Sequence, residues 1–109
     1  MSYVLNEEEQ MLRDSAKAYL AEKSPVSELR RLRDEGCKDG FRHAVWRGMA
    51  EMGWTGILIG EDQGGVDMGY AAAGVLLQEM GRTLTASPYI PSAILCATAL
   101  KLAGTDAQK

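Results

Sequence analysis

The chain has 109 residues, with 46% hydrophobic and 25% charged side chains and a formal net charge of −3. This composition is typical of one ordinary globular domain, and the length leaves no room for a second, catalytic domain. Asp and Glu number 15 against 12 Lys and Arg, and no basic cluster lies along the chain. Both features argue against a nucleic-acid-binding protein.

The cysteines and the uncharged segments bear on where the protein works. Cys37 and Cys96 are too far apart in the sequence for a redox or zinc motif, which indicates a reducing compartment. The acidic N-terminus lacks the basic and apolar regions of a signal peptide. The uncharged stretch 83–100 contains two prolines and several hydroxyl residues, which argue against a membrane span. We therefore expect a cytoplasmic protein.

Two helices are predicted in the first third of the chain. Asn6 and Glu9 have the spacing of a capping box, and apolar residues recur at helical intervals after them, which predicts a helix over 7–22. Pro25 suits the first turn of a short second helix that ends at Gly36. Because its apolar stripe is narrow, we expect this second helix to be mostly exposed to solvent.

Three more helices are predicted after residue 38. Asp39 is the expected N-cap of a third helix, which ends at Gly53. The apolar segment 54–59 is too short for a helix and is expected to be an irregular, buried connector. A central helix is expected over 69–82, and a fifth helix from about residue 91 or 92 to 103. With no convincing strand, the predicted fold is all-α, an orthogonal or up-down bundle of about five helices.

Charge is sparse in the last two predicted helices. Only three of the 37 residues from Met68 to Gly104 are charged, so these helices have too few polar residues for a solvated face each. We expect the chain to dock there against further protein, either additional domains or another subunit. The alternative is that both helices form the centre of this domain.

Residue chemistry alone predicts no reaction. His43 is the single histidine, so no histidine pair is present to bind a metal. The glycine-rich segment 60–65 matches no phosphate-binding motif and contains two carboxylates, so it is interpreted as a structural turn.

Several short motifs follow one another in a characteristic order and spacing. They are the opening helix Leu5–Asp14, Met-x-Glu-x-Gly-Trp at 49–54, the connector 56–59 leading to Gly64 and Gly65, Glu-Met-Gly-Arg at 79–82, and the tail 104–109. Together they resemble the N-terminal helical domain of the acyl-CoA dehydrogenase family. The resemblance covers nearly the whole chain, so residues 1–109 are expected to form this one domain.

The sequence departs from the family pattern at two loop positions. Gly60 stands where the family often has proline, and Gln63 where an aromatic residue commonly precedes the glycine pair. The segment 81–91 is similar to bacterial branches of the family, including subunits that pair with a second, unlike subunit. In the family, such paired subunits act on dicarboxylic, aromatic or steroid acyl-CoA substrates.

The resemblance implies flavin chemistry in lipid and fatty acid metabolism. In the family, a carboxylate base removes the α-proton of an acyl-CoA thioester while the β-hydrogen passes to FAD as hydride. The flavin and the base belong to a middle β-domain and a C-terminal helical domain, which the 109 residues lack. The chain is therefore expected to be a truncated piece, inactive alone and unable to hold FAD by itself.

The resemblance also implies a substrate-binding role for the segment after the Glu-Met-Gly-Arg motif. It maps the acyl-chain wall onto Ser87, Pro91 and Leu95, although these residues could equally pack the fifth helix against its neighbours. The implied partners are an acyl-CoA, the remaining domains, a homo- or hetero-oligomer and an electron-transfer flavoprotein. Alternatives are an acyl-CoA oxidase, a nitroalkane oxidase, or a stand-alone helical interaction module derived from this domain.

Overall fold

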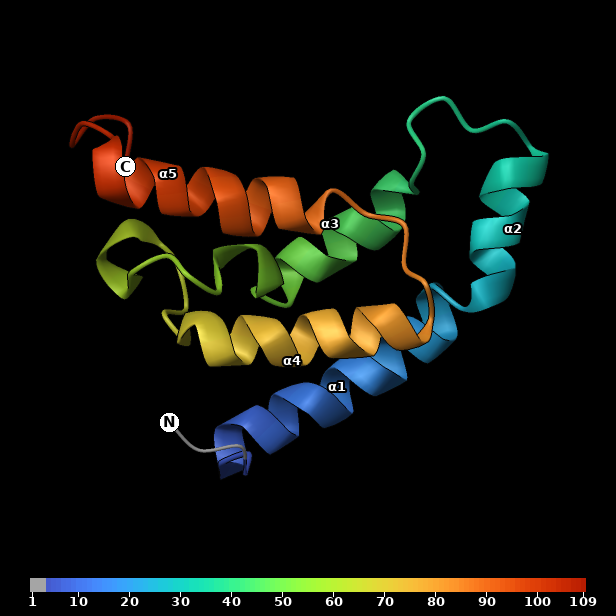
Figure 1. Ribbon diagram of the computed structural model, residues 1–109, viewed down its shortest axis with the longest axis horizontal. Helices are drawn as coiled ribbons and strands as arrows, with labels where there is room; N and C mark the ends of the chain where they lie inside the picture. Colours follow the sequence, from blue (N-terminus) through green and yellow to red (C-terminus); the bar gives the residue numbers. More distant parts are fainter. Residues whose placement is uncertain (1–3) are drawn as a thin grey trace.

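The computed structural model describes residues 4–109, and this part of the chain is entirely helical, without a β-strand. Its five α-helices, two 3₁₀ turns and one π-helical segment follow the order of the predicted elements. The expected all-α fold is therefore confirmed. Figure 1 shows α1 and α4 side by side in the lower part of the molecule, α3 and α5 in the upper part, and α2 at the edge.

The first helix, α1 (Glu7–Lys23), begins with the predicted capping box. The Asn6 side chain accepts a hydrogen bond from the Glu9 backbone N–H at 2.8 Å, and the Glu9 carboxylate accepts one from the Asn6 N–H at 3.1 Å. Both N–H groups would otherwise lack a partner at the helix start. Ala16 and Leu20 are buried in the core cluster, so a narrow apolar stripe holds α1 against the domain.

The central helix is α4 (Gly69–Arg82), as predicted. Its buried side chains are Ala72, Ala73, Val75, Leu76, Glu79 and Met80. The Glu79 carboxylate is 1% exposed and accepts hydrogen bonds from Arg13 of α1 at 3.3 Å and from Arg82 at 3.1 Å. A buried carboxylate is costly without partners, and here both are guanidinium groups. The bond from Arg13 joins α1 to α4, whereas Arg82 lies one turn after Glu79 on α4 itself. The chain itself thus covers the buried face of α4.

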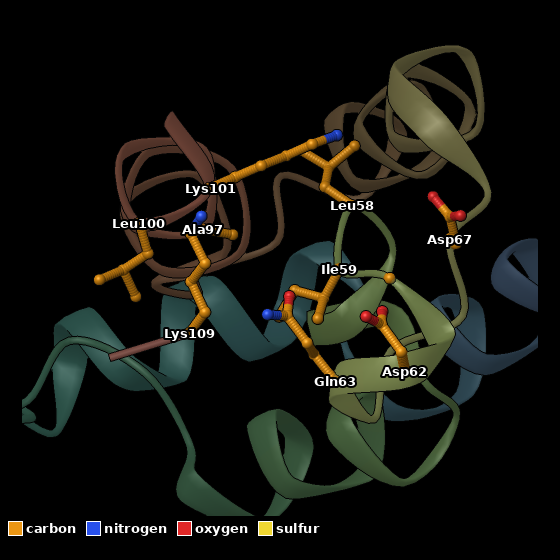
Figure 2. A pocket seen from close by; sticks show the side chains of 10 residues that line it. Leu58, Ile59, Asp62, Gln63, Asp67, Ala97, Leu100, Lys101 and Lys109 are labelled. Carbon is orange, nitrogen blue, oxygen red and sulfur yellow. The ribbon is translucent and has the colours of Figure 1, made fainter. Parts of the chain in front are cut away.

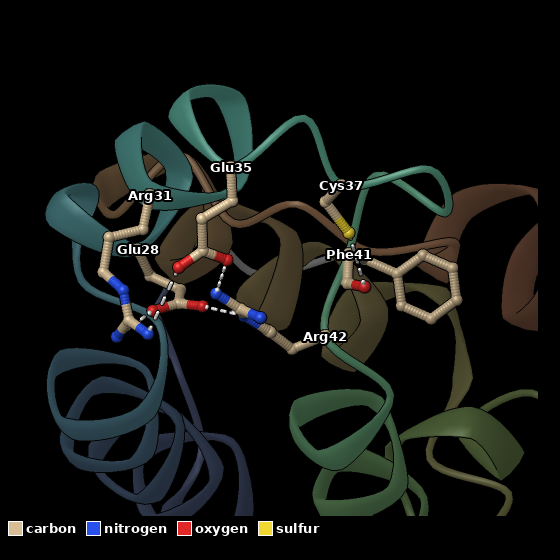
Figure 3. A network of polar contacts seen from close by, with 6 residues as sticks. All are labelled: Glu28, Arg31, Glu35, Cys37, Phe41 and Arg42. Carbon is tan, nitrogen blue, oxygen red and sulfur yellow. Dashed lines mark hydrogen bonds and ion pairs between the residues drawn. The ribbon is translucent and has the colours of Figure 1, made fainter.

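The second helix, α2 (Val26–Asp34), is mostly exposed, as predicted, with Leu32 as its buried residue. Arg42 connects it to the start of the next helix by donating to Glu28 and to Glu35, each at 2.6 Å (Figure 3). The hydrogen bonds to Glu28 and then Glu35 raise the pKa of the Arg42 guanidinium. These bonds orient α2 although it buries little apolar surface.

The third helix, α3 (His43–Glu51), begins later than predicted. The expectation that Asp39 caps it is wrong, because the N-cap is Arg42 and the Asp39 carboxylate instead contacts Nε2 of His43 at 2.8 Å. The other end of α3 agrees with the prediction. Gly53 follows it with a φ of +84°, a conformation that glycine adopts without steric cost.

The connector after α3 is irregular and largely buried, as expected. A 3₁₀ turn, Trp54–Gly56, places Trp54 in the core, and Ile57 and Leu58 follow it there. A second 3₁₀ turn, Glu61–Gln63, follows. After it, the backbone at Gly65 lies close to the backbone of Ile59. A Cβ on Gly65 would overlap the Ile59 carbonyl, so this position requires glycine.

The last helix runs from Ile90 to Ala103, close to the predicted range. Its first part, Ile90–Cys96, is π-helical, which the sequence did not predict, and α5 (Ala97–Ala103) continues it. The molecule measures 42 × 34 × 20 Å, and a thickness of 20 Å admits about two layers of helices. This helix lies along the upper edge in Figure 1 and leaves three leucines uncovered, namely Leu95, Leu100 and Leu102.

Candidate functional site

An apolar groove lies where the end of α4 meets the start of the π-helical segment. Its volume is about 370 Å³. The residues that line it are Leu77, Met80, Gly81, Leu84, Thr85, Ser87, Tyr89, Ile90 and Pro91. We call this cavity the α4–π groove.

The three residues predicted to form the substrate wall differ in their relation to the groove. Ser87 is half-buried and lines it, and Pro91 is exposed and lines it as well. Leu95 is not among the lining residues, and its side chain is 61% exposed four residues further along the same helix. The structure thus brings Ser87 and Pro91 together and leaves Leu95 outside the groove.

Tyr89 anchors the groove to the core. Its ring is 1% exposed, and its hydroxyl donates a hydrogen bond to the Trp54 carbonyl at 2.8 Å. Its ring also makes a T-shaped contact with Trp46, with 6.5 Å between ring centroids. Burial raises the pKa of the Tyr89 phenol well above its usual range, so the hydroxyl remains a donor. The start of the π-helical segment is therefore fixed to the connector after α3.

Backbone hydrogen bonds at the end of α4 shape the other side of the groove. The N–H of Thr85 donates to the Met80 carbonyl at 3.0 Å, and the N–H of Leu84 donates to the Gly81 carbonyl at 3.4 Å. These are the two bonds of a Schellman motif, which reverses the chain after a helix. Leu84 occupies the left-handed position of the motif, with a φ of +51°.

Sequence reasoning missed most of the lining residues. Leu77, Met80 and Tyr89 were not singled out because a residue that lines a groove and one that packs a core have the same apolar composition. One signal was present for Leu84, since a leucine follows the helix end where glycine is usual.

The groove is suited to an apolar chain and not to proton transfer. None of its lining residues is Asp, Glu, His, Lys or Arg, and its polar side chains are the hydroxyls of Thr85, Ser87 and Tyr89. A flavin dinucleotide carries a charged diphosphate, which needs cationic groups or a row of backbone N–H donors. The lining residues provide no cation, so no charged side chain of the α4–π groove can pair with the diphosphate of FAD.

A second cavity, of about 250 Å³, lies between the connector loop and the last helix (Figure 2). Leu58 and Ile59 contribute apolar walls, while Lys101 comes from α5 across the cavity. Asp62 and Asp67 lie on the loop side. Because charges of both signs surround the cavity and none of these three charged side chains is buried, its composition selects no particular ligand.

The single histidine forms an exposed pair. Nε2 of His43 lies 2.8 Å from the Asp39 carboxylate one helical turn earlier, and the Phe41 ring lies 4.8 Å from the imidazole between centroids. Sequence reasoning assigned Asp39 to the helix cap and missed its pairing with His43. Within residues 4–109, no group of three His, Cys, Asp or Glu side chains is arranged to hold a metal ion.

Two further expectations concern a membrane span and the pairing of the cysteines. In the part of the chain that the structure describes, no helix combines the length and apolar character needed to cross a membrane. Cys37 is half-buried and Cys96 is exposed, and both are free thiols.

Comparisons with known proteins agree with the resemblance seen in the motifs. Residues 6–109 match the family model described as the acyl-CoA dehydrogenase N-terminal domain. The chain is 30% identical over 103 residues to a protein named acyl-CoA dehydrogenase IpdE2 from Mycobacterium tuberculosis (strain ATCC 25618 / H37Rv). The match covers 94% of this chain and 32% of the relative, so the chain spans about a third of that relative's length. No solved structure gives a significant match.

Proposed function

Because the chain belongs to the family of acyl-CoA dehydrogenase N-terminal domains, we propose that it forms one wall of the acyl-chain pocket in an enzyme that α,β-desaturates an acyl-CoA thioester. The observation that carries this proposal is the α4–π groove. It is apolar, and two of the three residues that the resemblance assigns to the substrate wall line it.

In this role the groove positions the substrate and excludes water. An acyl chain carries no charge, so apolar walls with a few hydroxyl groups suit it better than a polar cleft. The anchored ring of Tyr89 and the fixed φ of Pro91 keep the wall rigid. Rigidity matters because a displacement of about 1 Å at the reacting carbons can lower the rate about a hundredfold.

The remaining parts of the reaction lie outside this groove. We assign FAD and the proton-abstracting carboxylate to further domains of the same enzyme, because the groove provides neither a cation nor a base. Leu95 extends the wall toward those domains, since it is exposed beyond the groove on the same helix. A homo- or hetero-oligomer, an electron-transfer flavoprotein as the acceptor and a cytoplasmic location complete the proposal.

The proposal is tested by filling the groove in the intact product of the native gene. Ser87→Trp should raise KM for long-chain acyl-CoAs at least tenfold, because the indole occupies space that the acyl chain needs. Short-chain substrates should be affected less. The matched control is Ser15→Trp on the exposed face of α1, which should leave both KM values unchanged.

Circular dichroism and the unfolding temperature of each variant show whether the fold is intact. Equal KM values for long acyl-CoAs in Ser87→Trp and the unaltered protein, with an intact fold, would contradict the assignment of the groove.

A second candidate function is a helical interaction module that binds a partner protein. The observation that favours it is the row of exposed leucines on the last helix, Leu95, Leu100 and Leu102. Flavin content and acyl-CoA turnover distinguish the two functions, because an interaction module has no flavin and turns over no acyl-CoA.

A further inference from the structure

Leu84 has an unusual backbone conformation for its residue type. Its φ of +51° lies in the left-handed region, where the Cβ of an L-residue approaches the following carbonyl oxygen. Among residues 4–109, the other non-glycine residue with a positive φ is Asp67, whose short polar side chain tolerates this region. An aspartate carboxylate can hydrogen-bond to the nearby backbone in this conformation, whereas a leucine side chain has no polar atom with which to do so.

The end of α2 provides a comparison within the same molecule. There Cys37 N–H donates to the Leu32 carbonyl at 3.0 Å and Gly36 N–H donates to the Arg33 carbonyl at 3.1 Å. These are the same two bonds of a Schellman motif, and the left-handed position is Gly36, with a φ of +64°. The chain thus uses glycine for this turn after α2 and leucine after α4.

Packing within the described chain does not explain the leucine. Its side chain is 56% exposed, so it buries little apolar surface in return for an unfavourable backbone. The turn after α4 borders the α4–π groove, which Leu84 lines together with Ile90. A strained residue at the edge of a ligand cavity is a recognised sign of function.

We propose that Leu84 is a specificity-determining residue, whose side chain closes one side of the groove and limits the bulk of the acyl group. This inference rests on the proposed function of the groove. The strained turn directs the side chain of Leu84 into a position at the groove wall. A glycine would relax the turn but would leave the groove wider.

The test compares Leu84→Gly with Leu84→Ala in the intact product of the native gene. Both variants lack the isobutyl group, so both should raise the ratio of kcat/KM for ring-bearing over linear acyl-CoAs about tenfold. Their stabilities should differ, because alanine keeps the strained φ and glycine relieves it. The Gly variant is expected to unfold about 2 °C above the Ala variant.

The control is Leu29→Ala, since Leu29 is an exposed leucine on α2 that does not line the groove. It should leave the substrate ratio unchanged. A substrate ratio unchanged in both Leu84 variants would overturn the inference while leaving the proposed function intact, as would a Gly variant no more stable than the Ala variant. If the unaltered protein turns over no acyl-CoA, the proposed function fails, and the inference fails with it.

Discussion

At the scale of single residues, Tyr89 links the groove to the core of the domain. Its hydroxyl donates to the Trp54 carbonyl at 2.8 Å in a buried setting. Tyr89→Phe should lower the free energy of unfolding by about 1–2 kcal/mol, because the buried carbonyl then loses its hydrogen-bond donor. Urea unfolding of the two proteins at neutral pH measures this difference.

The same residue gives a prediction at alkaline pH. An unfolded tyrosine loses its proton near pH 10.0, whereas burial raises the pKa of folded Tyr89. Above pH 10 the unfolded state therefore binds fewer protons than the folded state, so stability falls as the pH rises further. Tyr89→Phe should flatten this decline. The pKa of Tyr19 is also raised, mainly by burial, so some decline will persist in the variant. An identical pH dependence in both proteins would contradict this account.

At the scale of helices, two glycines have opposite expected effects. The Tyr19 hydroxyl of α1 donates to the Val45 carbonyl of α3 at 2.9 Å, and a Cβ on Gly48 would overlap that hydroxyl. Gly48→Ala should therefore destabilise the protein by about 1–3 kcal/mol. Gly74 of α4 is exposed with nothing within 4 Å of its Cβ position, so Gly74→Ala should stabilise by about 0.5–1 kcal/mol.

Thermal or urea unfolding of the two variants gives the comparison directly. A Gly48→Ala protein as stable as Gly74→Ala would show that α1 and α3 do not pack through Tyr19 as described.

Helix positions were predictable where the signal is local. The capping box at Asn6 and the left-handed glycine at Gly53 mark their helix ends through hydrogen bonds and backbone conformation within a few residues. Asp39 failed as a cap because the helix begins only at His43, with Arg42 as its N-cap, and the Asp39 carboxylate contacts the His43 imidazole. The π-helical start of the last helix carries no local signal that distinguishes it from an α-helix.

The candidate site was less predictable than the helices. Ser87 and Pro91 were placed on the wall by family resemblance, whereas the contacts that form the groove join residues of separate elements. The bond between Tyr89 and Trp54 spans 35 residues, and no local pattern indicates such a pair.

At the scale of the whole molecule, the few charged residues of 68–104 reflect two kinds of apolar surface, one buried and one exposed. The buried face of α4 is covered by the chain itself, whereas Leu95, Leu100 and Leu102 remain exposed on the last helix. The expectation of an exposed apolar surface therefore applies to the last helix. We expect the isolated 109-residue chain to self-associate through these leucines at high concentration.

Sedimentation equilibrium tests this expectation. Replacing the three leucines with glutamine should weaken self-association at least tenfold, because each change removes apolar area from the contact. Leu29→Gln on α2 is the control, since that leucine is also exposed but lies elsewhere. A strictly monomeric unaltered chain at high concentration would contradict the expectation.

The central claim is that this domain serves an enzyme that desaturates acyl-CoA thioesters. The most direct measurement is an anaerobic titration of the intact native gene product with acyl-CoAs of varied chain length and ring content, followed by flavin absorbance. We predict a flavin-containing protein whose visible absorbance is bleached by at least one member of the panel. A colourless protein, or a flavin spectrum that no acyl-CoA changes, would contradict the account.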